Sequence, residues 1–120
     1  DLVEAGALLH DIGRAVTHDL SHADVGGEMC RSLGIDEAVV SIVERHVGAG
    51  LTADESSLLG LIPRDRMPRT IEEKIVAHAD NLVKGTRIIT IEGRLAWTID
   101  LPRRNRRRIY RLALEVEAFR

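Results

Sequence analysis

The chain has 120 residues, enough for one compact domain, and 44% of them are hydrophobic, enough for a buried core. Charged residues make up 30% of it and nearly cancel to a net charge of −2, so the overall charge indicates neither a nucleic-acid nor a membrane partner. No apolar run reaches the ~18 residues of a membrane span, and the single Cys30 excludes an intramolecular disulfide and suits a cytoplasmic location.

Glycines divide the first half of the chain into helical segments. Gly13 and Gly34 each follow an apolar periodic stretch, as helix-terminating glycines do, and Asp36 is a typical N-cap residue. The segment after Asp36 carries apolar residues at helical spacing, so one wide face of it should be buried. A loop bracketed by Pro63 and Pro68 follows. The helices expected here cover residues 2–11, 21–33, 36–47 and 54–61.

A capping sequence opens the second half. Thr70 and Glu73 have the spacing of a capping box, which predicts a helix that runs to about residue 84, where Gly85 stops it. Residues 86–99 stay unassigned. Their stretch RIITI is rich in strand-forming residues, but no partner strand is in view and a lone hairpin would be marginal.

The C-terminal residues 100–119 are expected to form the last helix, capped by Asp100 and with Pro102 in its first turn. Trp97, just before it, sits among apolar residues and is interpreted as a core or interface anchor. Together these segments predict an all-α bundle of five to six helices, in a single domain over residues 1–120. The last helix should turn four residues toward the core: Ile109, Leu112, Val116 and Phe119.

The first helix ends in an unusual pair, His10 and Asp11, directly after two leucines. Charged side chains are rarely buried unless they are paired or bind a metal. Neighbours on a helix point about 100° apart, so both reach one metal only if it lies beside the helix end. Imidazole and carboxylate together suit a divalent transition metal. The dipeptide alone favours a structural role, because a histidine near a helix C-terminus commonly interacts with the helix dipole.

Three further residues change this balance. His22 opens a helix and has Gly26 one turn later, where a glycine lets another helix approach closely. His46 ends the third helix and again precedes a glycine. Asp80 lies in AHADNL, among small residues that admit a neighbouring helix. His78, two residues earlier, points about 200° away from Asp80 and is interpreted as structural.

Four segments together resemble the metal-dependent phosphohydrolases with an HD domain of the HDIG type: LLHDIGR, HADVGGEM, IVERHVGAG and KIVAHADNL. The resemblance covers residues 1–85, and the longer stretch EEKIVAHADNLVKG is similar to uncharacterised archaeal HD proteins. It implies an HD-domain helical bundle. It also implies one or two divalent ions per chain, of Mn, Fe, Ni, Zn or Mg.

Residues can be carried over from the family one by one. His10, Asp11 and Asp80 match its metal ligands, while His22 and His46 match the histidines that hold a second ion in members with two metals. The family has a further histidine upstream of the HD pair, and no histidine precedes His10. We therefore expect that the N-terminal helix of the domain is missing from these residues.

The activity implied is hydrolysis of a phosphate ester, of a nucleotide or related small molecule, by a water that the metal activates. Asp11 would bridge the metals or orient this water. Arg14 is expected to steady phosphate charge, where relatives often carry lysine, although a solvated surface role fits it equally well. His18, in the following polar loop, is expected to contact a phosphate or protonate the leaving group. An exposed loop histidine without a role is the alternative.

Six arginines lie between Arg103 and Arg111 and support a second hypothesis, a non-catalytic regulatory module that binds a nucleotide or RNA through the last helix. Against it, no aromatic residues interleave with the arginines, and these spread around much of the helix. A solvated face with acidic partners is favoured over a nucleic-acid site. No membrane partner is expected, and the sequence leaves the oligomeric state open.

Overall fold

The computed structural model describes residues 1–119 and confirms an all-α bundle. The described residues form seven α-helices, one more than the upper end of the expected range, with a 3-10 turn and a small hairpin. Residue 120, the last of the predicted domain, lies outside them. The elements are α1 (Leu2–Leu9), η1 (Ile12–Ala15), α2 (His22–Ser32), α3 (Glu37–Glu44), α4 (Ala53–Leu58), α5 (Ile71–Asn81), β1 (Val83–Lys84), β2 (Arg87–Ile88), α6 (Ile91–Trp97) and α7 (Arg103–Ala118).

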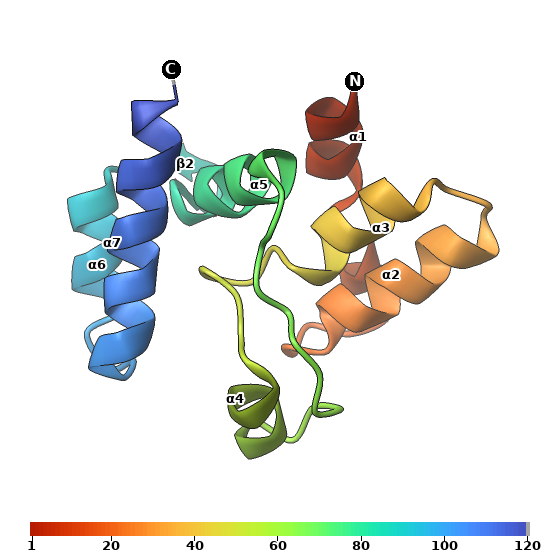
Figure 1. Cartoon of the computed structure of the whole chain (residues 1–120), viewed down its shortest axis with the longest axis horizontal. Coiled ribbons are helices and arrows are strands. Elements are labelled where there is room, and N and C mark those ends of the chain that lie inside the picture. Colours follow the sequence, from red (N-terminus) through yellow and green to blue (C-terminus); the bar gives the residue numbers. More distant parts are fainter. Residues whose placement is uncertain (120) are drawn as a thin grey trace.

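Helix α5 lies near the middle of the molecule, between α1, α2 and α3 on one side and α6 and α7 on the other (Figure 1). Helix α4 lies apart from both groups, on the long connection from α3 to α5 (Figure 1). Two small apolar cores result, one on each side. The first is built from Cys30, Val39, Val40 and Val43, and the second from Ala49, Ala77, Ile109 and Leu112. Among the helices of residues 1–119, none is both long and apolar enough to cross a bilayer.

Two glycines let η1 cross the start of α2 at backbone distance. A Cβ atom on Gly13 would lie 1.9 Å from the carbonyl oxygen of His22 and 2.7 Å from the amide nitrogen of Gly26. Both distances are far below any real contact, so only glycine fits at this position. The prediction that Gly26 admits a close approach is therefore confirmed. The crossing brings the residues just before η1 next to the first residue of α2.

Two helices end earlier than predicted, and a histidine follows each end. Helix α1 stops at Leu9 rather than residue 11, and α3 stops at Glu44 rather than residue 47. In each case the histidine that follows, His10 or His46, places its Nδ1 atom on a carbonyl oxygen three residues earlier. These side chains satisfy carbonyls that the backbone leaves open at a helix end, so the helices can stop there.

Helix α4 spans fewer residues than predicted, but its N-terminal cap is more complete than that of α5. The Thr52 hydroxyl accepts from the Glu55 amide while the Glu55 carboxylate accepts from the Thr52 amide, a complete capping box. The box predicted at Thr70 forms only halfway. Thr70 caps α5 through the Glu73 amide, but the Glu73 carboxylate accepts from the amide of Arg69 instead of that of Thr70.

The partner strand for RIITI lies in the segment predicted as helix. Helix α5 ends at Asn81. Val83 then pairs with Ile88 in an antiparallel hairpin whose two strands have two residues each. Gly85 stands in the turn with φ of +62°, a left-handed conformation that favours glycine. Residues 91–97 of the unassigned stretch form α6. Local propensity alone could not divide this stretch between strand and helix.

The C-terminal helix is confirmed, whereas Asp100 and Phe119 do not have their predicted roles and Trp97 does not lie in a core. Asp100 does not cap α7, because Pro102 occupies the N-cap position one residue before the helix. Phe119 stands 66% exposed at the C-cap, where it lines an open groove beside α5 instead of packing in the core. Trp97 is 62% exposed, and the Lys84 ammonium covers its ring. Ile109 and Leu112 are buried as expected.

Candidate metal centre

Five side chains from separate elements converge on one place, which we call the His–Asp cluster: His10, Asp11, His22, His46 and Asp80. Two groups of three overlap within it. His10, His46 and Asp80 form the first, and Asp11, His22 and His46 form the second. In each group the three ligand-type atoms lie within 4.8 Å of one another. His46 belongs to both groups and lies at their junction.

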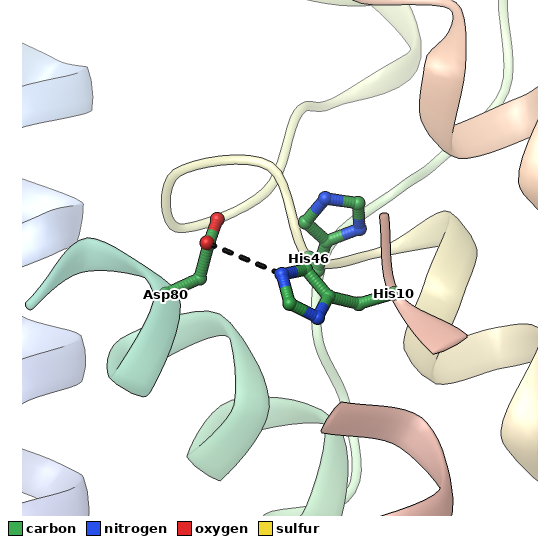
Figure 2. A group of neighbouring side chains, drawn as sticks. All are labelled: His10, His46 and Asp80. Atoms are coloured by element: carbon green, nitrogen blue, oxygen red, sulfur yellow. Dashed lines mark ion pairs between the residues drawn. The ribbon is translucent and has the colours of Figure 1, made fainter. Parts of the chain in front are cut away.

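The distances between these atoms are short. His10 Nε2 lies 3.3 Å from Asp80 Oδ1, and Figure 2 shows the His10 and His46 rings side by side, facing Asp80 from α5. Asp11 lies between the two groups, since its Oδ2 is 3.4 Å from His10 Nε2 and its Oδ1 is 3.3 Å from the Nε2 atoms of both His22 and His46. One carboxylate thus faces all three imidazoles.

The backbone orients all three histidine rings in the same way. The Nδ1 atoms of His10, His22 and His46 lie 2.7, 2.9 and 2.6 Å from backbone carbonyl oxygens three residues earlier. A carbonyl oxygen only accepts, so Nδ1 carries the hydrogen and the Nε2 atom of the neutral ring is a free lone pair. This backbone contact sets the tautomer and orientation that metal-ligating histidines need.

The cluster is electrostatically incomplete. His22 Nε2 and His46 Nε2 lie 3.0 Å apart, and two lone pairs at that distance repel unless a proton or a cation lies between them. Asp11 Oδ1 is buried and has no hydrogen-bond donor among residues 1–119; Arg14 Nε approaches to 3.2 Å but is not aligned for a hydrogen bond. Converging lone pairs beside an anionic oxygen form a donor set that fits a divalent cation.

Two groups of the cluster titrate toward their metal-binding forms, and a third, His10, titrates away from it. Burial lowers the pKa of His46 and is only partly offset by the Val43 carbonyl, so this ring is neutral near pH 7. Burial opposes the ionisation of Asp80, but its hydrogen bond with His10 and the neighbouring His46 ring outweigh burial and lower its pKa. That same hydrogen bond raises the pKa of His10. Neutral imidazole and ionised carboxylate are the forms that bind metals. His46 and Asp80 therefore have the required forms, whereas His10 has to release a proton to bind a cation.

A cavity of about 450 Å³ opens beside the cluster. Four residues near the cluster line one end of it: Arg14, His22, His46 and Asp80. The prediction that Arg14 lies at the site agrees with this geometry. The structure does not bring the His18 side chain there, because it is exposed and lies outside the cavity lining, while its backbone carbonyl accepts from Arg14 Nη1 at 3.4 Å.

Sequence reasoning missed the residues that fix α5 at this site. Arg94, in the unassigned stretch, donates to the carbonyl oxygens of Asn81 and Val83 just past Asp80, each at 2.6 Å. The Asn81 amide donates to the Gly48 carbonyl oxygen at 3.0 Å, which joins the end of α5 to the loop after His46. No local pattern indicates contacts between residues 13 and 33 positions apart.

Comparison with known proteins gives a consistent result. A family model described as HD domain matches residues 1–85. An uncharacterised protein of Methanocaldococcus jannaschii is 55% identical over 92 residues, which is 77% of this chain and 54% of that protein. No solved structure matches significantly.

Two further relatives carry names that refer to RNA. A tRNA (cytidine(56)-2'-O)-methyltransferase of Picrophilus torridus is 57% identical over 76% of this chain, and a ribonuclease Y of Acidothermus cellulolyticus is 37% identical over 70% of it. The chain spans only 27% and 14% of those proteins, and about half of the Methanocaldococcus protein. The similarity therefore concerns one part of each relative.

Proposed function

The chain belongs to the HD domain family, and from this premise we propose that it is a metal-dependent phosphohydrolase, which cleaves a phosphate ester of about nucleotide size with a water. HD domains typically bind divalent metals, and the chain carries a His–Asp cluster that could hold one. One observation carries the proposal. Three histidine Nε2 atoms and two carboxylates meet beside a cavity large enough for a small ligand.

The overlapping groups suggest which residues hold the metal. His10, His46 and Asp80 would hold one ion, and Asp11, His22 and His46 a second, with the two Asp11 oxygens turned toward different groups. This pairing differs from the one implied by family resemblance, which joined His10 and Asp11 with Asp80. Mixed nitrogen and oxygen donors suit Mn, Fe, Ni or Zn better than Mg, which prefers oxygen.

A divalent metal at this place supplies Lewis-acid polarisation of a phosphoryl oxygen and lowers the pKa of a nearby water. The protein's own residues supply the rest. Asp11 accepts a hydrogen bond from the attacking water and so orients it. Arg14 is held by its contacts with Asp11 Oδ1 and the His18 carbonyl, and lines the cavity, where its guanidinium can donate to phosphate oxygens.

The test is phosphate release by the protein after metal removal and reloading with Mn, Fe, Ni, Zn or Mg. Substrates would be p-nitrophenyl phosphate, its bis-ester and nucleoside monophosphates. Asp11→Asn keeps the shape of the side chain and should leave the circular dichroism spectrum unchanged, while phosphate release falls by more than about 100-fold. A folded, reloaded wild-type protein that releases phosphate from none of these esters would refute the proposal.

A second candidate function is a non-catalytic module that binds a nucleotide or RNA through α7, and the names of two relatives favour an RNA-related role. Three of the six arginines of α7 are engaged within the protein. Arg104 and Arg108 pair with Glu55, and Arg106 donates to the Leu95 carbonyl oxygen. Equal RNA binding by wild type and Asp11→Asn, with no turnover by either, would favour this module over the enzyme.

A further inference from the structure

The far wall of the cavity lies outside the part of the chain that matches the family. The match ends at residue 85, whereas α6, α7 and the turn between them contribute Thr98, Leu101, Arg104 and Asn105 to the lining. Helix α4 adds two leucines to the rim. The cavity lining at the His–Asp cluster thus lies within the matched domain, while the lining residues from α7 and the turn before it lie beyond the match.

Two polar side chains on this wall have unused hydrogen-bonding capacity. Asn105 is half-buried, and its side-chain amide makes no hydrogen bond with any residue in the described range 1–119. Arg104 Nε lies 3.0 Å from Glu55 Oε2, and the Arg104 guanidinium makes no hydrogen bond within that range, so it has donors to offer a ligand. An amide that both donates and accepts, beside a planar cation, suits a ligand group with a hydrogen-bonding edge.

Glu55 fixes this wall in place. Its carboxylate accepts from Arg108 Nη1 and Nη2 at 2.7 and 2.6 Å, a bidentate pair, and also from the Thr52 amide. Glu55 itself is buried, at 6% exposure. This contact ties α4 to the first turns of α7, so Arg104 and Asn105 are presented on a rigid element rather than on a loop.

Large apolar side chains surround the same end of the cavity. Leu59 is 51% exposed and Leu101 is 43% exposed, although both line the cavity. Solvent-facing leucines around a hollow gain free energy when an apolar surface covers them. A nucleobase has apolar faces and a polar edge, so it matches leucines, a free amide and a guanidinium together. A volume of about 450 Å³ suits one nucleotide.

We propose that Arg104 and Asn105 bind the base of a nucleoside monophosphate whose phosphate lies at the His–Asp cluster. Asn105 hydrogen-bonds to the base edge, and Arg104 lies beside it. This inference rests on the proposed phosphohydrolase function and names its substrate class. It assigns base recognition to helix α7, beyond the matched domain, and predicts that Arg103 and Arg107 of the same helix do not contribute to it.

The test compares nucleoside monophosphates with ribose 5-phosphate, which lacks only the base. In the wild type, kcat/KM should be higher for the preferred nucleotide. Asn105→Ala and Arg104→Gln should each lower the ratio of kcat/KM for the nucleotide over that for ribose 5-phosphate by about five- to tenfold, the effect of one or two hydrogen bonds. Arg103→Ala and Arg107→Ala, at exposed positions of the same helix, should leave this ratio unchanged.

The outcomes separate the two proposals. Equal hydrolysis of nucleotides and ribose 5-phosphate, or a ratio that Asn105→Ala does not change, would overturn base recognition while phosphohydrolase activity stands. If neither ester is hydrolysed, titration calorimetry with the same two ligands decides the inference, since tighter nucleotide binding that is lost in Asn105→Ala supports it. Binding of short RNA that depends on Arg103 and Arg107 instead of Asn105 would overturn it in favour of a polymer surface.

Discussion

Two regions place charged or polar groups in the interior: the His–Asp cluster, and the ion pair of Asp24 with Arg66. They differ in how many of their buried polar atoms have hydrogen-bond partners. Arg66 is 4% exposed, donates from Nε and Nη2 to both Asp24 oxygens at 2.9 and 2.6 Å, and gives Nη1 to the carbonyl of Ile62. In the His–Asp cluster, by contrast, Asp11 Oδ1 lacks a donor within the described chain.

The difference indicates which group is structural and which is functional. Buried polar atoms normally have hydrogen-bond partners, and an exception needs an explanation such as an absent ion. The Asp24–Arg66 pair is complete within the protein and fixes the loop before α5 onto α2. The His–Asp cluster has converging acceptor atoms and too few donors, which is the arrangement that a bound cation would complete.

The largest expected effect is that of His46→Gln, since His46 belongs to both groups of the cluster and is 1% exposed. Loss of a shared ligand removes metal-dependent stabilisation of several kcal/mol from the transition state, which corresponds to more than about 1,000-fold in phosphate release. Phosphate release and bound metal are measured together. Retention of both in the variant would show that the cluster is not the catalytic centre.

Gly13→Ala should be the most destabilising single change, by about 4 kcal/mol, because its Cβ strikes the backbone of α2, which cannot move aside. Gly27→Ala is the matched control. There a Cβ meets only the flexible side chain of Glu44, so the expected loss is below about 1 kcal/mol. Urea unfolding of both variants measures the difference, and equal stabilities would contradict the crossing described between η1 and α2.

Arg66→Met tests the satisfied ion pair and should reduce the free energy of unfolding by about 3 kcal/mol, because it leaves the Asp24 carboxylate partly buried without its main partner. Adding Asp24→Leu to this variant should restore part of the loss, since apolar replacements of a buried pair are often neutral. Neither change should alter metal content. Metal loss in Arg66→Met would mean that the two regions are coupled.

The smallest effect concerns Glu55, whose hydrogen bonds with Arg108 hold its pKa down to about 2, against an ordinary value of 4.5. A depressed carboxylate pKa stabilises the fold above about pH 4.5, and this stability is lost as the pH falls toward 2. After allowance for solvent screening of the largely exposed Arg104, the expected contribution is about 1 to 2 kcal/mol.

Glu55→Gln should therefore be less stable than the wild type at pH 6 and nearly as stable at pH 2.5. Thermal unfolding across this range measures the gap between the two proteins. A gap that stays constant with pH would show that the carboxylate charge does not contribute. Gln keeps the volume and an acceptor oxygen, so α4 should stay in place.

Local patterns predicted most helices, and the family resemblance grouped five candidate ligands, whose side chains do converge. That they bind metal stays a prediction. His10 and Asp11 stood out because polar residues ended an apolar face, and Gly26 indicated a close helix crossing. The sequence failed where a residue's role depends on a distant partner. Arg66 and Arg94 carry no local signal, since their partners lie 42 and 13 residues away.

The ends of helices were mispredicted for a related reason. The helix expected to reach residue 84 ends at Asn81, because the next residues pair with a strand that propensity alone could not place. Phe119 had the right spacing to face the core, but it lies at the C-cap of α7, where an open groove beside α5 leaves it exposed. Hydrophobic spacing predicts which face a helix buries and leaves open how far along it the burial extends.

The central claim is that the His–Asp cluster holds a metal, and metal stoichiometry tests it most directly. Wild type and Asp11→Asn would be stripped with chelator, reloaded with Mn, Fe, Ni, Zn or Mg, dialysed and measured by plasma mass spectrometry. We predict one or two equivalents of one of these metals in the wild type, and a clear loss in the equally folded variant. A folded wild type that retains no metal after reloading, or a variant that retains as much, would contradict the claim.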